Sequence, residues 1–233
     1  MLDSTINNRT VNYLEPYLGY VSDNTLFGYT GPISGRRFRF QVTPTVGNFR
    51  WVEYLADYRR YDPIIFNYLT VATRGLASLN IGPDADSLRK YIGYPDIIRG
   101  YDRETFRTTG CATGATALYY KCSPLLGSRI AVGNAELRFP LLRGQAFGLP
   151  IALPPIEGLV FYDAGLAWFA GQSINGTRSN SYDASAQRYL LTSHGYGVRV
   201  NLFGFAILRW DYSYPHDALN RKPYWQFSLG PSY

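Results

Sequence analysis

The sequence predicts an all-β protein, an antiparallel β-barrel that crosses a membrane with its strands. Apolar and polar residues alternate over many short segments, as they do along strands with one apolar face, and no segment has a helical period. The 21 tyrosines and one methionine favour half-exposed positions, where a ring meets apolar matter and its hydroxyl meets water. A membrane helix needs roughly 20 apolar residues. The longest apolar region, 146–171, is interrupted by three prolines and cannot form one.

Nine strands are expected along the chain. They cover 11–21, 36–43, 49–61, 64–77, 134–141, 157–168, 195–202, 205–214 and 224–233. A tight turn at Asp62-Pro63 is expected to precede the fourth strand, whose two faces the pattern does not assign. In the strand over 134–141, Glu136 lies on the polar face. In the last strand, Trp225, Phe227, Leu229 and Tyr233 share the apolar face.

This alternation fits either a membrane barrel or a soluble β-sandwich with one solvated face. Two features favour the barrel. Tyrosine and tryptophan lie near the strand ends on the apolar face, as in an aromatic girdle. The polar face repeatedly carries arginine with aspartate or glutamate, and charges of both signs suit an enclosed wet lumen. The soluble β-sandwich binding module remains the alternative.

The lengths of the connections also favour a barrel. Counted back from the C-terminus, long connections at 214–224, 169–189 and 94–130 alternate with a short one at 202–205. Membrane barrels show this asymmetry between short periplasmic turns and long outer loops. The connection at 142–156 is too long for this pattern, and the one at 47–48 is too short.

The charge and the N-terminal residues bear on the partners and the cellular location of the protein. The net charge is +6, but the basic residues are scattered singly, so no nucleic acid is expected as a partner. Residues 1–10 are polar and lack the apolar core of a signal peptide. The chain is therefore expected to be either cytosolic or part of a longer exported protein.

Four ordered motifs resemble one known family. They are "IRGY" at 98–101, "AELRFPL" at 135–141, "VFYDAGLAW" at 160–168 and "FSLGPSY" at 227–233. Together they are similar to the C-terminal barrel region of the BamA/TamA-type outer-membrane assembly family, within the bacterial surface antigen superfamily. The resemblance implies a location in the bacterial outer membrane and a barrel of sixteen strands. Residues 1–233 are then one barrel region, the C-terminal part, without upstream strands or periplasmic domains.

The resemblance also places 94–131 as a long outer loop that folds into the lumen, with Ile98, Arg99, Gly100 and Tyr101 as its motif. Gly100 allows a tight turn, and the planar guanidinium of Arg99 suits carboxylates. The family match puts Asp163 in the lumen beside Glu136, on strands about 4.8 Å apart. Arg99 is therefore expected to bridge these two acids. The alternative is a solvated arginine that is unrelated to either acid.

The last strand carries a second functional hint. Pro231 has no N–H to donate, and the neighbouring Gly230 is a weak strand residue. A frayed chain end would explain both residues. The resemblance implies instead a seam, because in this family the first and last strands pair poorly and separate sideways. The exposed edge would then accept a client strand through backbone hydrogen bonds.

The two cysteines, Cys111 and Cys122, lie in the expected outer loop and are either free thiols or a disulfide. Their spacing matches no metal site. The two histidines, His194 and His216, belong to no catalytic motif, so no enzyme, metal or cofactor is expected.

The predicted function is insertion or translocation of proteins. Its expected partners are outer-membrane lipids, client β-barrel or secreted proteins, and possible periplasmic or accessory subunits. A passive or secretion pore of the same superfamily is the alternative within the membrane.

Overall fold

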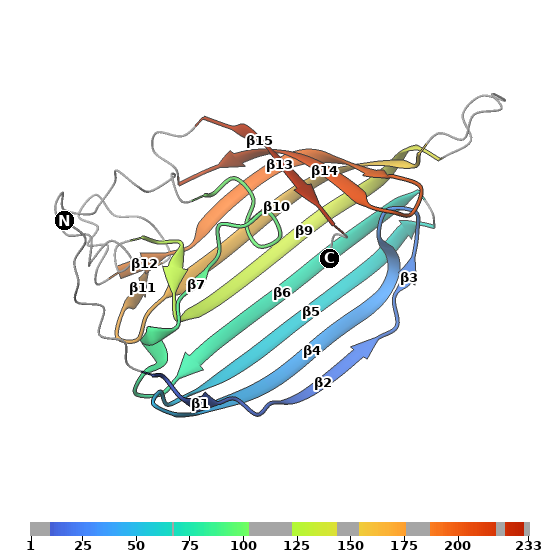
Figure 1. Ribbon diagram of the computed structural model, residues 1–233. Helices are drawn as coiled ribbons and strands as arrows, with labels where there is room; N and C mark the ends of the chain where they lie inside the picture. The colour runs from blue at the N-terminus through green and yellow to red at the C-terminus, as the bar shows by residue number, and fades with distance from the viewer. Residues whose placement is uncertain are drawn as a thin grey trace.

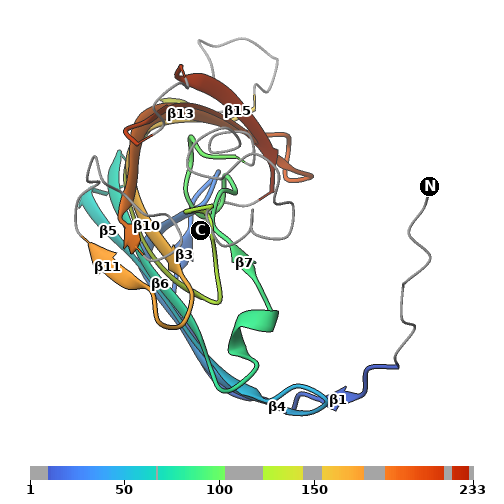
Figure 2. The same cartoon turned by 90° about the vertical axis from the view of Figure 1, so that its left-hand side faces the viewer.

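The computed structural model describes residues 10–66, 68–102, 123–143, 154–175, 187–217 and 222–230. Figure 1 shows one large sheet of long, slanted strands, and Figure 2 shows that this sheet curves into a trough. The segment between β6 and β9 lies on the concave side of the trough. Among the described residues, no helix is long and apolar enough to cross a membrane.

The main sheet has eleven strands, all of which pair antiparallel. They are β1 (Tyr13–Leu14), β2 (Leu18–Asp23), β3 (Leu26–Phe27), β4 (Pro32–Gly47), β5 (Trp51–Ile65), β6 (Leu69–Ile81), β9 (Arg129–Leu142), β10 (Ile156–Trp168), β13 (Leu191–Asn201), β14 (Ile207–Pro215) and β15 (Tyr224–Leu229). Because β1, β2 and β3 all pair with β4, they form one interrupted first strand. The sheet therefore has nine rows, as the sequence predicted.

Several short elements lie at the end of the main sheet that carries the long connections. They are the 3₁₀ turn at Ala85–Ser87, the pair β7 (Lys90–Tyr91) and β8 (Leu126–Gly127), and the parallel pair β11 (Ser173–Asn175) and β12 (Gln187–Tyr189). We call this the loop end. The opposite end, where the turns at 28–31 and 202–206 and the turn between β5 and β6 lie, is the short-turn end.

The prediction of a turn at Asp62-Pro63 is wrong. Strand β5 continues through both residues, with Asp62 opposite Val71 and Pro63 opposite Thr70. The chain turns only after Ile65, whose carbonyl accepts the Tyr68 N–H at 2.8 Å. A register shift between Pro63 and Ile65 explains this, because proline is tolerated in a strand at such an irregularity, where no ladder hydrogen bond is needed.

The strand alternation separates two faces of very different character. The convex face presents large apolar side chains, such as Tyr54, Trp210 and Phe227, which are exposed. The concave face carries buried polar residues, and the apolar cluster near the loop end also lies there. This cluster consists of Ile92, Ile98, Tyr101, Leu125, Ile130, Val132, Ala167, Tyr189 and Leu191. The segment after β6 is therefore packed into the trough by apolar contacts.

Candidate functional site

The chain after β7 makes a compact turn before it reaches the concave wall. The backbone N–H groups of Ile97 and Ile98 both donate to the carbonyl of Tyr94, at 2.8 and 3.0 Å. Gly100 has φ +85°, which a side chain disfavours, and a Cβ there would lie 3.2 Å from the Ser213 Cβ. Glycine at this position lets the motif approach β14 closely.

Arg99 is fully buried and contacts two carboxylates. Its Nε and Nη2 donate to the two oxygens of Asp163, both at 2.7 Å, and its backbone N–H donates to the same carboxylate at 3.1 Å. Its Nη1 donates to Glu136 Oε1 at 2.7 Å. The guanidinium also stacks on the ring of Phe161, with Cζ 3.6 Å from the ring centroid. The N–H edges of this planar group and one of its faces therefore have partners of matching chemistry.

Glu136 is shared by three guanidinium groups. Besides Arg99, the buried side chains of Arg138 and Arg199 donate to Glu136 Oε2, at 2.9 and 2.7 Å. Arg138 is two residues away on β9, and Arg199 reaches across β10 from β13. We call Arg99, Glu136, Asp163, Arg138 and Arg199 the lumenal cluster. Its buried charges are mutually hydrogen-bonded, as burial of ions requires.

The rest of the motif is fixed by packing and one hydroxyl. Ile98 fills the space over Gly165, where an added Cβ would lie 1.9 Å from the Ile98 Cδ1. The Tyr101 hydroxyl donates to the carbonyl of Thr192 at 2.6 Å and lies 3.2 Å from a carboxylate oxygen of Asp217. Burial and the Asp217 charge raise the pKa of Tyr101, so its hydroxyl stays protonated and remains a donor.

Sequence reasoning missed several residues that hold the motif in place. Asn134 donates from Nδ2 to the carbonyl of Ile97 at 2.8 Å and to Asp163 at 2.9 Å. Arg209 on β14 donates to Asp96, and Arg74 on β6 donates to the carbonyl of that same residue. The alternation placed Asn134 and Arg209 on the polar face, but it did not assign the faces of the strand that carries Arg74. The residues that these side chains contact could not be predicted, because the contacts depend on the register between strands.

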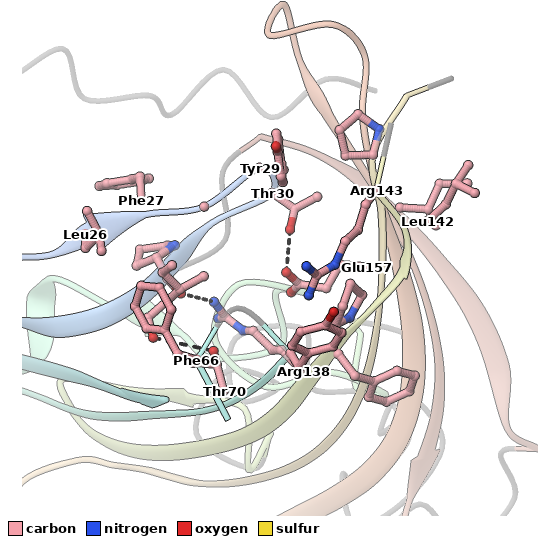
Figure 3. Close-up of a pocket in the computed structure, with 18 residues that line it drawn as sticks. Leu26, Phe27, Tyr29, Thr30, Phe66, Thr70, Arg138, Leu142, Arg143 and Glu157 are labelled. Atoms are coloured by element: carbon pink, nitrogen blue, oxygen red, sulfur yellow. Dashed lines mark hydrogen bonds between the residues drawn. The ribbon is translucent and has the colours of Figure 1, made fainter. Parts of the chain in front are cut away.

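The β3–β4 turn crosses to the far side of the trough at the short-turn end (Figure 3). We call residues 28–33 the inner hairpin. Thr30 Oγ1 donates to Glu157 Oε2 on β10 at 2.5 Å, and Asn201 on β13 donates to the carbonyl of Tyr29. Arg138 Nη1 donates to the carbonyl of Pro32 at 3.3 Å. Arg138 therefore connects the inner hairpin to the lumenal cluster.

The closing strand, β15, forms one edge of the sheet and is only six residues long. Trp225, Phe227 and Leu229 project from its convex side and are more than half exposed. Gly230 has φ +128°, and its N–H still donates to the carbonyl of Ile207 at 3.0 Å. Gln226 Oε1 accepts the Gly100 N–H at 2.7 Å, which ties the motif to this strand.

Four candidate residues lie outside the described residues. They are Pro231 and Tyr233 of the closing strand and the two cysteines, Cys111 and Cys122. Of the expected outer loop, 94–131, the described residues are 94–102 and 123–131.

The described strands form an open, curved antiparallel sheet with a polar concave face, as part of a transmembrane β-barrel would. The chain matches the Omp85 superfamily domain over residues 15–233 and belongs to that superfamily. Its members are outer-membrane barrels that insert or secrete proteins and are not enzymes. No curated protein matches the chain. One large curved sheet, with no second large sheet packed on it among the described residues, and this membership exclude the soluble β-sandwich.

Proposed function

We propose that this chain inserts or translocates proteins at the bacterial outer membrane of Gram-negative cells, without nucleotide or cofactor. Its partners are outer-membrane lipids and client β-barrel or secreted proteins. The observation that carries this proposal is the closing strand. Strand β15 pairs with β14 over six residues, whereas β9 and β10 are 14 and 13 residues long. A short edge strand with free backbone groups is a template for an incoming strand.

The geometry of the closing strand indicates which backbone groups would meet the client. The Gly230 N–H donates to Ile207 of β14. Because alternate residues of a strand point the same way, the N–H groups of Gln226 and Ser228 also point to β14. Those of Trp225, Phe227 and Leu229 point to the free edge. These three residues would donate to a client strand while their side chains face lipid.

Obstruction of the lumen favours insertion over the alternative of a passive or secretion pore. Ile98, Arg99 and Tyr101 are fully buried against the concave wall near the loop end. At the short-turn end, Thr30 of the inner hairpin is 2% exposed and contacts the opposite wall. We propose that the loop over 94–131 folds into the lumen as a plug and that Arg99 fixes it to Glu136 and Asp163. A plugged lumen leaves the closing strand as the route for clients.

A reconstitution experiment tests this function. The chain in liposomes should accelerate folding of an urea-unfolded client β-barrel over protein-free liposomes, and it should show little steady conductance in planar bilayers. Replacing Phe227 by proline removes one N–H from the free edge and should abolish the acceleration. Phe227→Ala is the matched control, because it removes the ring and keeps the N–H. Large steady conductance without acceleration of folding would instead support the pore.

A further inference from the structure

A cavity of about 490 Å³ lies at the short-turn end, between the inner hairpin and the ends of β9 and β10 (Figure 3). Its walls are mostly apolar. Leu26 and Phe27 come from β3, Phe66 from the β5–β6 turn, and Phe139 and Leu142 from β9. The volume falls in the range that holds small organic ligands, roughly 300–1,000 Å³. Apolar walls of this size are suited to a hydrocarbon chain.

The cavity also contains charges of both signs. Glu157 enters it from β10, with Oε2 accepting the Thr30 hydroxyl. Glu157 Oε1 is buried and has no hydrogen-bond partner among the described residues. Arg199 Nη1 forms an ion pair with this oxygen at 3.8 Å, a distance too long for a hydrogen bond. A buried carboxylate oxygen without a donor is costly, so this oxygen is poised to accept a hydrogen bond from a ligand.

Arg143 lines the same cavity from the end of β9. Its guanidinium lies over the ring of Tyr68, with Cζ 3.8 Å from the ring centroid, and the residue is exposed. A guanidinium has five N–H donors and binds phosphate well, so it can take a phosphate oxygen in addition to its ring contact. The cavity thus offers an acceptor for a cation and a donor group for an anion.

The position of the cavity indicates how a ligand would reach it. Some lining side chains, such as Thr70 and Glu157, belong to the concave face. Others, such as Phe139 and Ile156, belong to the alternate set that faces lipid. The cavity therefore opens around the ends of the strands and is continuous with the lipid-facing surface. The exposed rings of Phe27 and Phe66, at 61% and 60%, extend that surface to the rim.

We propose that this cavity binds one phospholipid whose headgroup carries a primary ammonium, of the phosphatidylethanolamine type. The ammonium donates to Glu157 Oε1, the phosphate accepts from Arg143, and an acyl chain lies along Leu26, Phe27 and Phe66. This site concerns the lipid around the barrel, and it stands whether or not the barrel inserts clients. A trimethylated ammonium has no N–H, so phosphatidylcholine lacks the donor that Glu157 needs.

Native mass spectrometry of the purified chain tests the site, with lipids of identical acyl chains added in turn. We expect phosphatidylethanolamine to be retained about tenfold more tightly than phosphatidylcholine or phosphatidylglycerol, the effect of one hydrogen bond to a charged group. Glu157→Gln keeps an oxygen for Thr30 and removes the charge, so it should abolish the preference. Equal retention of the three lipids, or a preference that survives in Glu157→Gln, would overturn the proposal.

A second pair of variants tests the apolar wall independently of Glu157. Phe66→Asp puts a charge where the acyl chain lies and should weaken retention of all three lipids. Phe205→Asp is the matched control, because Phe205 is 94% exposed at the neighbouring β13–β14 turn and does not line the cavity. Equal effects of the two variants would exclude this cavity as the lipid site. A photoreactive side chain at position 66 that captures peptide rather than lipid would also exclude it.

Discussion

The middle of the sheet and its closing edge differ in how they are stabilised. Strands β9 and β10 pair over their whole length and carry Glu136, Arg138 and Asp163, three of the five buried and hydrogen-bonded charges of the lumenal cluster. Strand β15 pairs over six residues, and its convex side chains are exposed. One residue of the loop motif, Gly100, reaches the edge through Gln226. The barrel therefore combines a rigid anchored wall with a weakly held edge, and function is expected at the edge.

The largest effect is expected from Glu136→Gln, at the centre of the rigid wall. The change leaves three buried guanidinium groups around a neutral amide, and it should cost about 3–5 kcal/mol in the free energy of unfolding. Urea unfolding of the chain in lipid vesicles measures this cost. Asp62→Asn is the control, because the exposed Asp62–Arg60 pair should contribute less than about 1 kcal/mol. Equal costs would show that the cluster does not stabilise the wall.

Arg99→Ala should release the loop while the strands stay folded. Asp163 then retains Asn134 as a side-chain partner but loses both guanidinium bonds, so the loop loses the ion pairs that Arg99 makes with the wall. We expect cleavage around residue 99 by external protease to rise about a hundredfold, which corresponds to ~3 kcal/mol. Arg60→Ala, at an exposed arginine, is the matched control. Cleavage no faster than in the control would contradict the plug.

Gly165→Ala should displace the loop by steric conflict alone, with all charges kept. The new methyl group would overlap the Ile98 side chain, and such overpacking costs about 1–3 kcal/mol. Gly133→Ala is the control on the neighbouring strand, because a Cβ there meets no atom within 4 Å. Tryptic cleavage of the loop and urea unfolding, measured together, separate loop release from global loss. Identical profiles for the two variants would mean that Ile98 does not sit against Gly165.

The smallest effect is expected at the link between the two regions. Gln226→Ala removes the acceptor of the Gly100 N–H and should cost about 1 kcal/mol. Hydrogen exchange should then speed up about fivefold at Gly100 and leave the β9 and β10 amides unchanged. Ser228→Ala, on the same face of β15, is the control. A change that spreads into β9 would show that wall and edge are one cooperative unit.

Strand periodicity predicted the faces of several strands, though not of the strand over 64–77, and the family resemblance suggested that Arg99, Glu136 and Asp163 lie together. Neither the periodicity nor the resemblance predicted that Arg199 lies beside Glu136. These residues lie on strands separated by β10, so their contact depends on sheet curvature and register, which a single sequence does not contain. The resemblance also covers the glycine-rich turn within 22–38, but the contact of the inner hairpin with β10 was missed for the same reason. Thr30 and Glu157 are 127 positions apart and meet only because the inner hairpin crosses the trough.

Hydrogen exchange at the backbone amides of Arg99 and Gly100, in the chain reconstituted in lipid bilayers, tests the central claim most directly. The Arg99 amide donates to Asp163 and the Gly100 amide donates to Gln226, at 3.1 and 2.7 Å. We predict that both amides exchange as slowly as those of β9, because the motif is anchored inside the barrel. Exchange at the rate of a free peptide would show that the loop lies in water and that the lumen is not plugged.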